Sequence, residues 1–175
     1  MPRRRRLKVT FDSSFWVHVV YLGLVDSLLH DYDLEVTREV EEELGTGSVS
    51  SEALRSSLAS KRIRRGASSI RRVYLHGRGE RAAINLALEK GLLLFIDDWR
   101  PAATARAASI ETLSSVLYLV KLYGQGRRKA DEVLDGLAFM ARRNTLRRDY
   151  LISALRLVAE IRRRRGKERP GGRRR

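Results

Sequence analysis

The segment from Gly79 to Asp98 constrains the fold more than any other part of the chain. It begins as an Ala- and Leu-rich helical run, stops at Lys90-Gly91, and continues as a short apolar strand that ends in two aspartates. In open parallel sheets, ligands bind in the crevice outside the carboxyl ends of the strands. We therefore expect Asp97 and Asp98 to lie at a ligand-binding edge, with Glu80 at the start of the helix that leads into the same strand.

The rest of the chain alternates strand-like and helical patterns. Residues 7–12 alternate as a strand does, and a helix capped by Ser13 or Ser14 is expected to continue as far as Leu28-Leu29. A further strand is expected at 33–37, another around 72–75, and a short strand or turn from 110. Further helices are expected at 38–44, 51–60, 100–108, 113–122, 130–142 and 149–161. Strands separated by helices predict a three-layer α/β/α fold with a mainly parallel central sheet.

Positive charge is concentrated in three parts of the chain. The sequence has 36 basic and 21 acidic residues, a formal net charge of +15. Five basic residues lie within the first eight, eight lie from Lys61 to Arg81, and nine lie from Arg162 onward. Basic clusters of this kind usually follow a phosphate backbone, so nucleic acid is the expected partner. Arginine tails that only aid solubility are the plainer alternative.

Length and composition exclude several classes of protein. A chain of 175 residues with 43% hydrophobic residues is expected to form one domain with a core. It has no cysteine, which excludes disulfides and thiolate metal sites and fits a cytoplasmic protein. No apolar run approaches the roughly 20 residues of a membrane span, so no membrane partner is expected. Residues 1–6 are interpreted as a basic tail, and residues 162–175 as a disordered basic tail.

Acidic residues recur where strands end and helices begin. Asp12 follows the first strand, Glu80 opens the central helix, and Asp97 and Asp98 close the next strand. Glu43, or one of its neighbours Glu39, Glu41 and Glu42, follows the second strand. Carboxylate oxygens are hard ligands suited to Mg²⁺ or Mn²⁺, and converging carboxylates repel one another unless cations neutralise them. These acids therefore predict a divalent-metal site.

Four stretches resemble a known family when they are taken in this order. They are FDSS before an apolar helix, LEVTREVEEEL, GERAAINLALEKGLLLFIDD, and a helix beginning RPAATARAA. Together they resemble a PIN-domain ribonuclease, with the archaeal and bacterial VapC-toxin-like branch as the nearest likeness. The resemblance covers about residues 7–160, and residues 7–161 are interpreted as the nuclease domain.

The resemblance implies a metal-dependent endoribonuclease that uses Mg²⁺ or Mn²⁺. It matches Asp12, Glu43 and Glu80 to the first three acids of the family and either Asp97 or Asp98 to the fourth, with a preference for Asp98 as the catalytic residue. It also implies RNA as substrate, a small antitoxin protein as partner if the chain is a toxin, and a homodimer. The chain departs from the family in lacking a proline before the second acidic helix and in carrying Glu80 where many members have Asp.

A competing hypothesis keeps the fold but not the reaction. In that interpretation the protein binds nucleic acid or assembles with partners through its basic segments without cleaving. The histidines are scattered, and His18 is interpreted as a packed or surface residue rather than as a ligand. Trp99 directly follows the acids, where it would either stack on a base or pack against a partner.

Overall fold

The computed structural model describes residues 6–143 and 145–167 and divides the chain into two compact units. The first unit ends at Ser115 and the second begins at Val116. The sequence predicts one continuous domain over residues 7–161 and carries no signal at this boundary.

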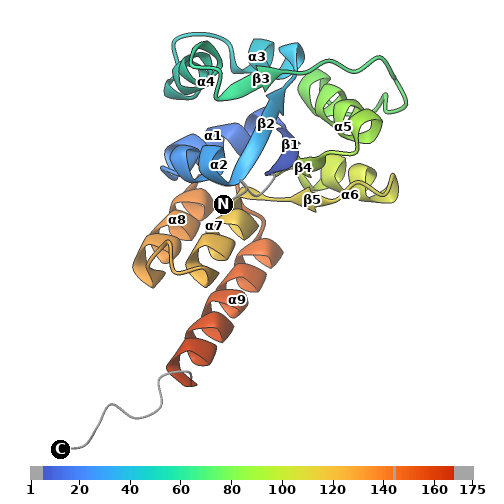
Figure 1. Ribbon diagram of the computed structural model, residues 1–175. Helices are drawn as coiled ribbons and strands as arrows, with labels where there is room; N and C mark the ends of the chain where they lie inside the picture. Colours follow the sequence, from blue (N-terminus) through green and yellow to red (C-terminus); the bar gives the residue numbers. More distant parts are fainter. Residues whose placement is uncertain (1–5, 144, 168–175) are drawn as a thin grey trace, which may run out of the picture. The chain divides into compact units, whose positions relative to one another are not determined.

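The first unit is built on a five-stranded sheet in which every pair of neighbours is parallel, in the order β3-β2-β1-β4-β5. Its strands are β1 (Leu7–Phe11), β2 (Tyr32–Val36), β3 (Ile63–Arg65), β4 (Leu93–Phe95) and β5 (Thr112–Leu113). Its helices are α1 (Ser13–Tyr21), α2 (Val25–Asp31), α3 (Arg38–Leu44), α4 (Val49–Ala59), α5 (Arg78–Lys90) and α6 (Trp99–Ala107). Figure 1 shows α1 and α2 on one face of this sheet and α5 and α6 on the other. The predicted α/β fold with a parallel central sheet is confirmed.

The strand order creates the place where a ligand would bind. The chain begins in the middle of the sheet at β1, adds β2 and β3 on one side, and then crosses to β4 and β5 on the other. Phe11 pairs with Phe95, so the chain leaves β1 and β4 at the same level of the sheet. The order reverses between these two strands, and such a switch point opens a crevice at their carboxyl ends.

Three local predictions were wrong for identifiable reasons. The first helix does not continue to residue 29, because it ends at Tyr21 with Leu22 as its C-cap, and Gly23 adopts a φ of 63°, which favours glycine. Asp12, rather than a serine, is the N-cap of α1. The strand expected around 72–75 is a loop, because the Asn85 amide binds the backbone of Arg72 and Val73 and so replaces a strand partner.

The second unit contains three helices within the described residues, namely α7 (Ser115–Gly124), α8 (Ala130–Arg142) and α9 (Arg148–Lys167). Residues 162–167, predicted to be disordered, continue α9 as a helix. Arginine favours helices, Arg164 pairs with Glu160 one turn earlier, and Arg165 donates to the carbonyls of Tyr123 and Gly124 at the end of α7. The remainder of that predicted tail, residues 168–175, and most of the N-terminal one, residues 1–5, lie outside the described part of the chain.

Candidate metal centre

Asp12 is fully buried where β1 ends and α1 begins. Its backbone N–H donates to the Phe95 carbonyl of β4, which fixes it at the switch point of the sheet. Its Oδ1 accepts from the Phe15 N–H at 2.8 Å, a normal helix cap. Its Oδ2 has no hydrogen-bond partner among the described residues. Since a buried polar atom without a partner is costly, this oxygen is a candidate for binding a cation.

Other carboxylates make the surroundings of Asp12 strongly acidic. The pKa of Asp12 is raised well above its usual value, first by burial and next by the negative charge of Asp97. Glu80 and Asp98 raise the pKa further, while the Phe15 N–H opposes the change. Four predicted site residues therefore lie within electrostatic reach of one another, which is the environment that a divalent cation relieves.

Asp97 and Asp98 differ sharply in their surroundings. The Asp97 side chain is 6% exposed; its Oδ2 lies 2.5 Å from His18 Nδ1, and its Oδ1 accepts from the Ser115 N–H at 2.7 Å. Asp98 is exposed at the N-cap of α6, and its side chain makes no capping bond. The sequence left the choice between them open with a preference for Asp98, whereas burial and the stronger effect on Asp12 favour Asp97.

Glu43 reaches the same region from α3. Its Oε2 accepts from the Ser13 hydroxyl at 2.9 Å, and its Oε1 accepts from the Gly79 N–H at 2.6 Å. Gly79 allows this approach, because a Cβ atom there would lie 2.2 Å from Glu43 Oε2. The alternatives Glu41 and Glu42 pair with arginines instead.

Glu80 begins α5 beside this contact. It lies in the first turn of the helix, where a negative charge is favourable, and its carboxylate occupies the space that a Cβ of Gly77 would need. The absence of a side chain at Gly77 leaves room for the Glu80 carboxylate, and its absence at Gly79 leaves room for the Glu43 carboxylate. The Gly-Arg-Gly turn is thus what allows both carboxylates to approach.

These five acids, Asp12, Glu43, Glu80, Asp97 and Asp98, are called the acidic edge below. In the described part of the chain, no three His, Cys, Asp or Glu side chains converge closely enough to form a metal ligand set. The residues nevertheless fit a hard cation in donor chemistry, since all five offer carboxylate oxygens and Asp12 Oδ2 is an unused one. Ligation would require these side chains to move closer together.

The basic segment, defined as Lys61 to Arg78, is partly neutralised by the protein itself. Arg62 pairs with Asp26, Arg65 with Glu41, and Arg78 with Glu42. Arg64, Arg71 and Arg72 are exposed, and no ion pair is described for them. The positive surface available to a polyanion is therefore smaller than the sequence suggested.

The loop in the basic segment is held at several points. The Ser69 hydroxyl and amide bind Glu89, and these hydrogen bonds lower the pKa of Glu89 to about 2. The Asn85 amide clamps the middle of the loop against α5, and His76 Nε2 lies 2.8 Å from Thr104 Oγ1 of α6. Its arginines are therefore presented from a backbone anchored to both helices.

Sequence reasoning missed the groups that orient the acids. His18, interpreted from the sequence as a packed or surface residue, is buried and contacts Asp97, a partner 79 positions away. Ser13, the first residue of α1, contacts Glu43. Trp99 is 42% exposed, with the Arg100 guanidinium 5.5 Å from its ring centre. One indication of this role of His18 was present in the sequence, namely that it is a polar residue among the apolar residues of the first helix.

Comparisons with known proteins give a distant structural likeness. No family model and no curated protein matches the chain. Among solved structures it is similar to a PilT N-terminus domain protein from the hyperthermophilic archaeon Sulfolobus solfataricus P2, with 13% sequence identity and a TM-score of 0.42. The match covers 62% of this chain and 87% of that one. No helix in the described residues is long and apolar enough to span a membrane.

Proposed function

We propose that this protein is a divalent-metal-dependent nuclease that hydrolyses RNA at the acidic edge. The observation that carries the proposal is Asp12, a fully buried carboxylate with an unused oxygen and with three further acids raising its pKa. Buried like charges are costly, so an arrangement of this kind indicates a function that a structural role alone does not supply.

The proposed metal is Mg²⁺ or Mn²⁺, held by Asp12 and Asp97 with Glu80, Asp98 and Glu43 around them. Such an ion supplies a Lewis acid that activates water and stabilises the leaving oxygen of a phosphodiester. His18 and the Ser115 N–H orient the Asp97 carboxylate, while Ser13 and the Gly79 N–H orient Glu43. Hydrogen bonds from other residues thus fix the carboxylates of both Asp97 and Glu43.

RNA is proposed as the substrate for two reasons. The sequence resembles a PIN-domain ribonuclease, and Arg64, Arg71 and Arg72 offer exposed cations for phosphate groups. The VapC-toxin-like branch, the small antitoxin, the homodimer and the cytoplasmic location stay predictions from the sequence.

A non-cleaving nucleic-acid-binding protein is the second candidate. One observation favours it, namely that the acids of the described chain do not converge into a ligand set. Under this alternative the basic segment binds RNA and the acidic edge holds no catalytic ion. The two candidates differ in a single measurable step, the hydrolysis of the phosphodiester.

The test is cleavage of a labelled RNA with Mn²⁺, with Mg²⁺ and with EDTA. We expect metal-dependent products that fall about a thousandfold in Asp12→Asn, since loss of a metal ligand removes several kcal/mol of transition-state stabilisation. Asp135→Asn removes the same charge from an exposed position of α8 and serves as the control. Products that persist in EDTA would sink the metal mechanism, and binding without cleavage under either metal would favour the second candidate.

A further inference from the structure

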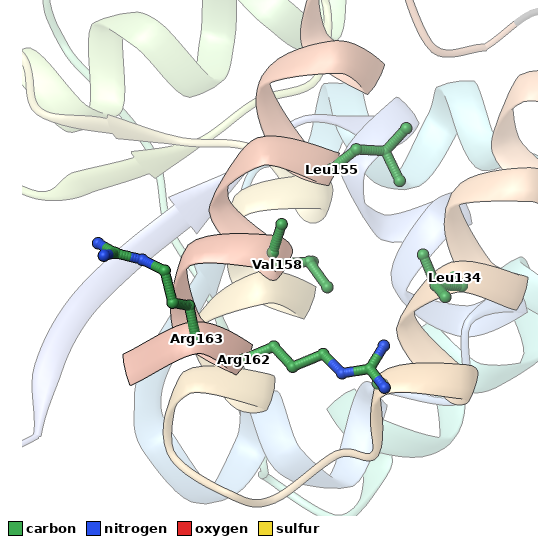
Figure 2. A pocket seen from close by; sticks show the side chains of 7 residues that line it. Leu134, Leu155, Val158, Arg162 and Arg163 are labelled. Carbon is green, nitrogen blue, oxygen red and sulfur yellow. The ribbon is translucent and has the colours of Figure 1, made fainter. Parts of the chain in front are cut away.

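The second unit contains an apolar groove that the proposed nuclease function does not use. A cavity of about 390 Å³ is lined by Ala130 and Leu134 of α8 and by Leu155, Val158, Ala159, Arg162 and Arg163 of α9. Figure 2 shows Leu134 projecting from one helix, with Leu155 and Val158 on the other. Leu134 and Leu155 are 41% and 40% exposed, although large aliphatic side chains favour burial.

The apolar surface continues along α9 beyond this cavity. Ile152, Leu155, Ala159 and Arg162 follow one another at spacings of three and four residues, so they share one face of the helix. Ile152 is 40% exposed. The eleven residues from Ile152 to Arg162 span about 15 Å at the rise of an α-helix, a length of nearly three turns. A stripe of this length matches another helix better than a small molecule.

Arg162 differs from Arg164 and Arg165 at the end of α9, which already have partners. Arg164 pairs with Glu160, and Arg165 binds carbonyls of α7 and lies over the Tyr123 ring. No hydrogen bond or ion pair is described for Arg162 within residues 6–143 and 145–167. Figure 2 shows its guanidinium extending past the cavity toward α8, while Arg163 points to the other side of α9. The groove therefore has an aliphatic floor, and of the two arginines that line its end, Arg162 is the one that extends toward α8.

We propose that this groove binds an amphipathic helix of a partner protein, with an aliphatic stripe against Leu134, Ile152 and Leu155 and a carboxylate that pairs with Arg162. The charge of the groove's end selects an acidic helix over a basic one. Nucleic acid suits the floor poorly, because bases stack on aromatic rings and no aromatic residue lines the cavity. The partner helix lies with its apolar face in the groove, as in other helix-in-groove complexes.

A peptide-display selection tests the proposal without assuming a partner. A phage library of random 16-residue peptides is selected on the full chain, and peptides that still bind Leu155→Gln are discarded. The expected survivors carry aliphatic residues at three- and four-residue spacing with Asp or Glu near one end. Failure to enrich any peptide family, or enrichment of basic peptides, would overturn the proposal.

Matched variants then locate the bound peptide by fluorescence anisotropy. Leu155→Gln is expected to weaken binding at least about tenfold, because it removes a buried leucine contact. Leu157→Gln is the control, since Leu157 is 39% exposed on the same helix but does not line the cavity. Arg162→Gln is expected to weaken binding about fivefold, whereas Arg156→Gln, an equal loss of charge at another exposed position of α9, should leave it unchanged.

Two outcomes of these measurements would contradict the proposal directly. Equal effects of Leu155→Gln and Leu157→Gln would place the peptide outside the groove. A single-stranded RNA that displaces the peptide and shows the same dependence on Leu155 would assign the groove to nucleic acid instead. Circular dichroism of each variant confirms that the helices remain folded.

Discussion

The acidic edge and the basic segment differ in how far the protein itself balances their charges. In the basic segment, three of the arginines pair with surface carboxylates, and in each pair at least one of the two side chains is more than half exposed. At the acidic edge, Asp12 is fully buried beside other carboxylates, and no cation of the described chain binds its Oδ2. Surface pairs of opposite charge contribute little, whereas buried like charges are costly. The difference supports the proposal of a ligand at the acidic edge, whereas part of the charge of the basic segment is already balanced by the protein.

The largest expected effect separates the two neighbouring aspartates. Asp97→Asn is expected to reduce RNA cleavage about a thousandfold, because the buried Asp97 carboxylate acts most strongly on Asp12. Asp98→Asn is expected to reduce it only about tenfold, since Asp98 is exposed and acts more weakly. The measurement is kcat/KM on one RNA with saturating Mn²⁺. The reverse order of losses would show that the exposed acid is the ligand.

The variant Gly79→Ala tests whether cleavage depends on the position of the Glu43 carboxylate. In Gly79→Ala, the added Cβ would lie 2.2 Å from Glu43 Oε2, so this carboxylate must move and lose its bond to the Gly79 N–H. We expect cleavage to fall about tenfold to a hundredfold while stability changes little, because Ala itself favours a helix. Gly124→Ala, whose Cβ would meet Ile161 at an ordinary 3.7 Å, is the control. A loss of stability without a loss of activity would assign Gly79 a structural role only.

Much of the acidic edge was predictable because its acids follow local patterns. Asp12 and Asp97 end apolar strands, and Glu80 begins a helix, so their positions follow from strand and helix boundaries alone. Their orientation was not predictable, because it depends on His18 and Ser115, which contact Asp97 across many residues of sequence. A strand was also predicted around residues 72–75, and β3 at Ile63–Arg65 was missed. Side-chain contacts are again the reason, because the Asn85 amide binds the backbone of Arg72 and Val73.

The stability of the fold is expected to fall as the pH rises, because of Asp12. Its pKa is raised in the fold above the usual 3.8, so folding favours the protonated acid. This contribution is complete below about pH 3.8 and is lost as the pH rises toward the higher pKa of the folded state. In urea unfolding, wild type should therefore lose stability relative to Asp12→Asn as the pH rises from about 3.8 to the raised pKa of the folded state, by about 1.4 kcal/mol for each pH unit between these two pKa values.

Metal binding should restore the stability that wild type loses at higher pH, and it should have no such effect on Asp12→Asn. Mn²⁺ at neutral pH is expected to raise the melting temperature of wild type and to leave Asp12→Asn unchanged, because binding to the folded state stabilises it. Removal of Mn²⁺ with EDTA should restore the original value. An equal rise in both proteins would place the ion elsewhere than at the acidic edge.

The smallest expected effect concerns the arginines of the basic segment. Arg71→Gln and Arg72→Gln should each weaken RNA binding a few-fold and reduce the salt slope by about 1, because each removes one cation available to a phosphate. Arg65→Gln removes the same charge from a residue that already binds Glu41, so its effect on affinity should be smaller. The measurement is RNA affinity at several salt concentrations without divalent metal. If all three variants weaken binding equally, pairing with Glu41 does not withhold Arg65 from RNA, and the contrast between paired and available cations fails.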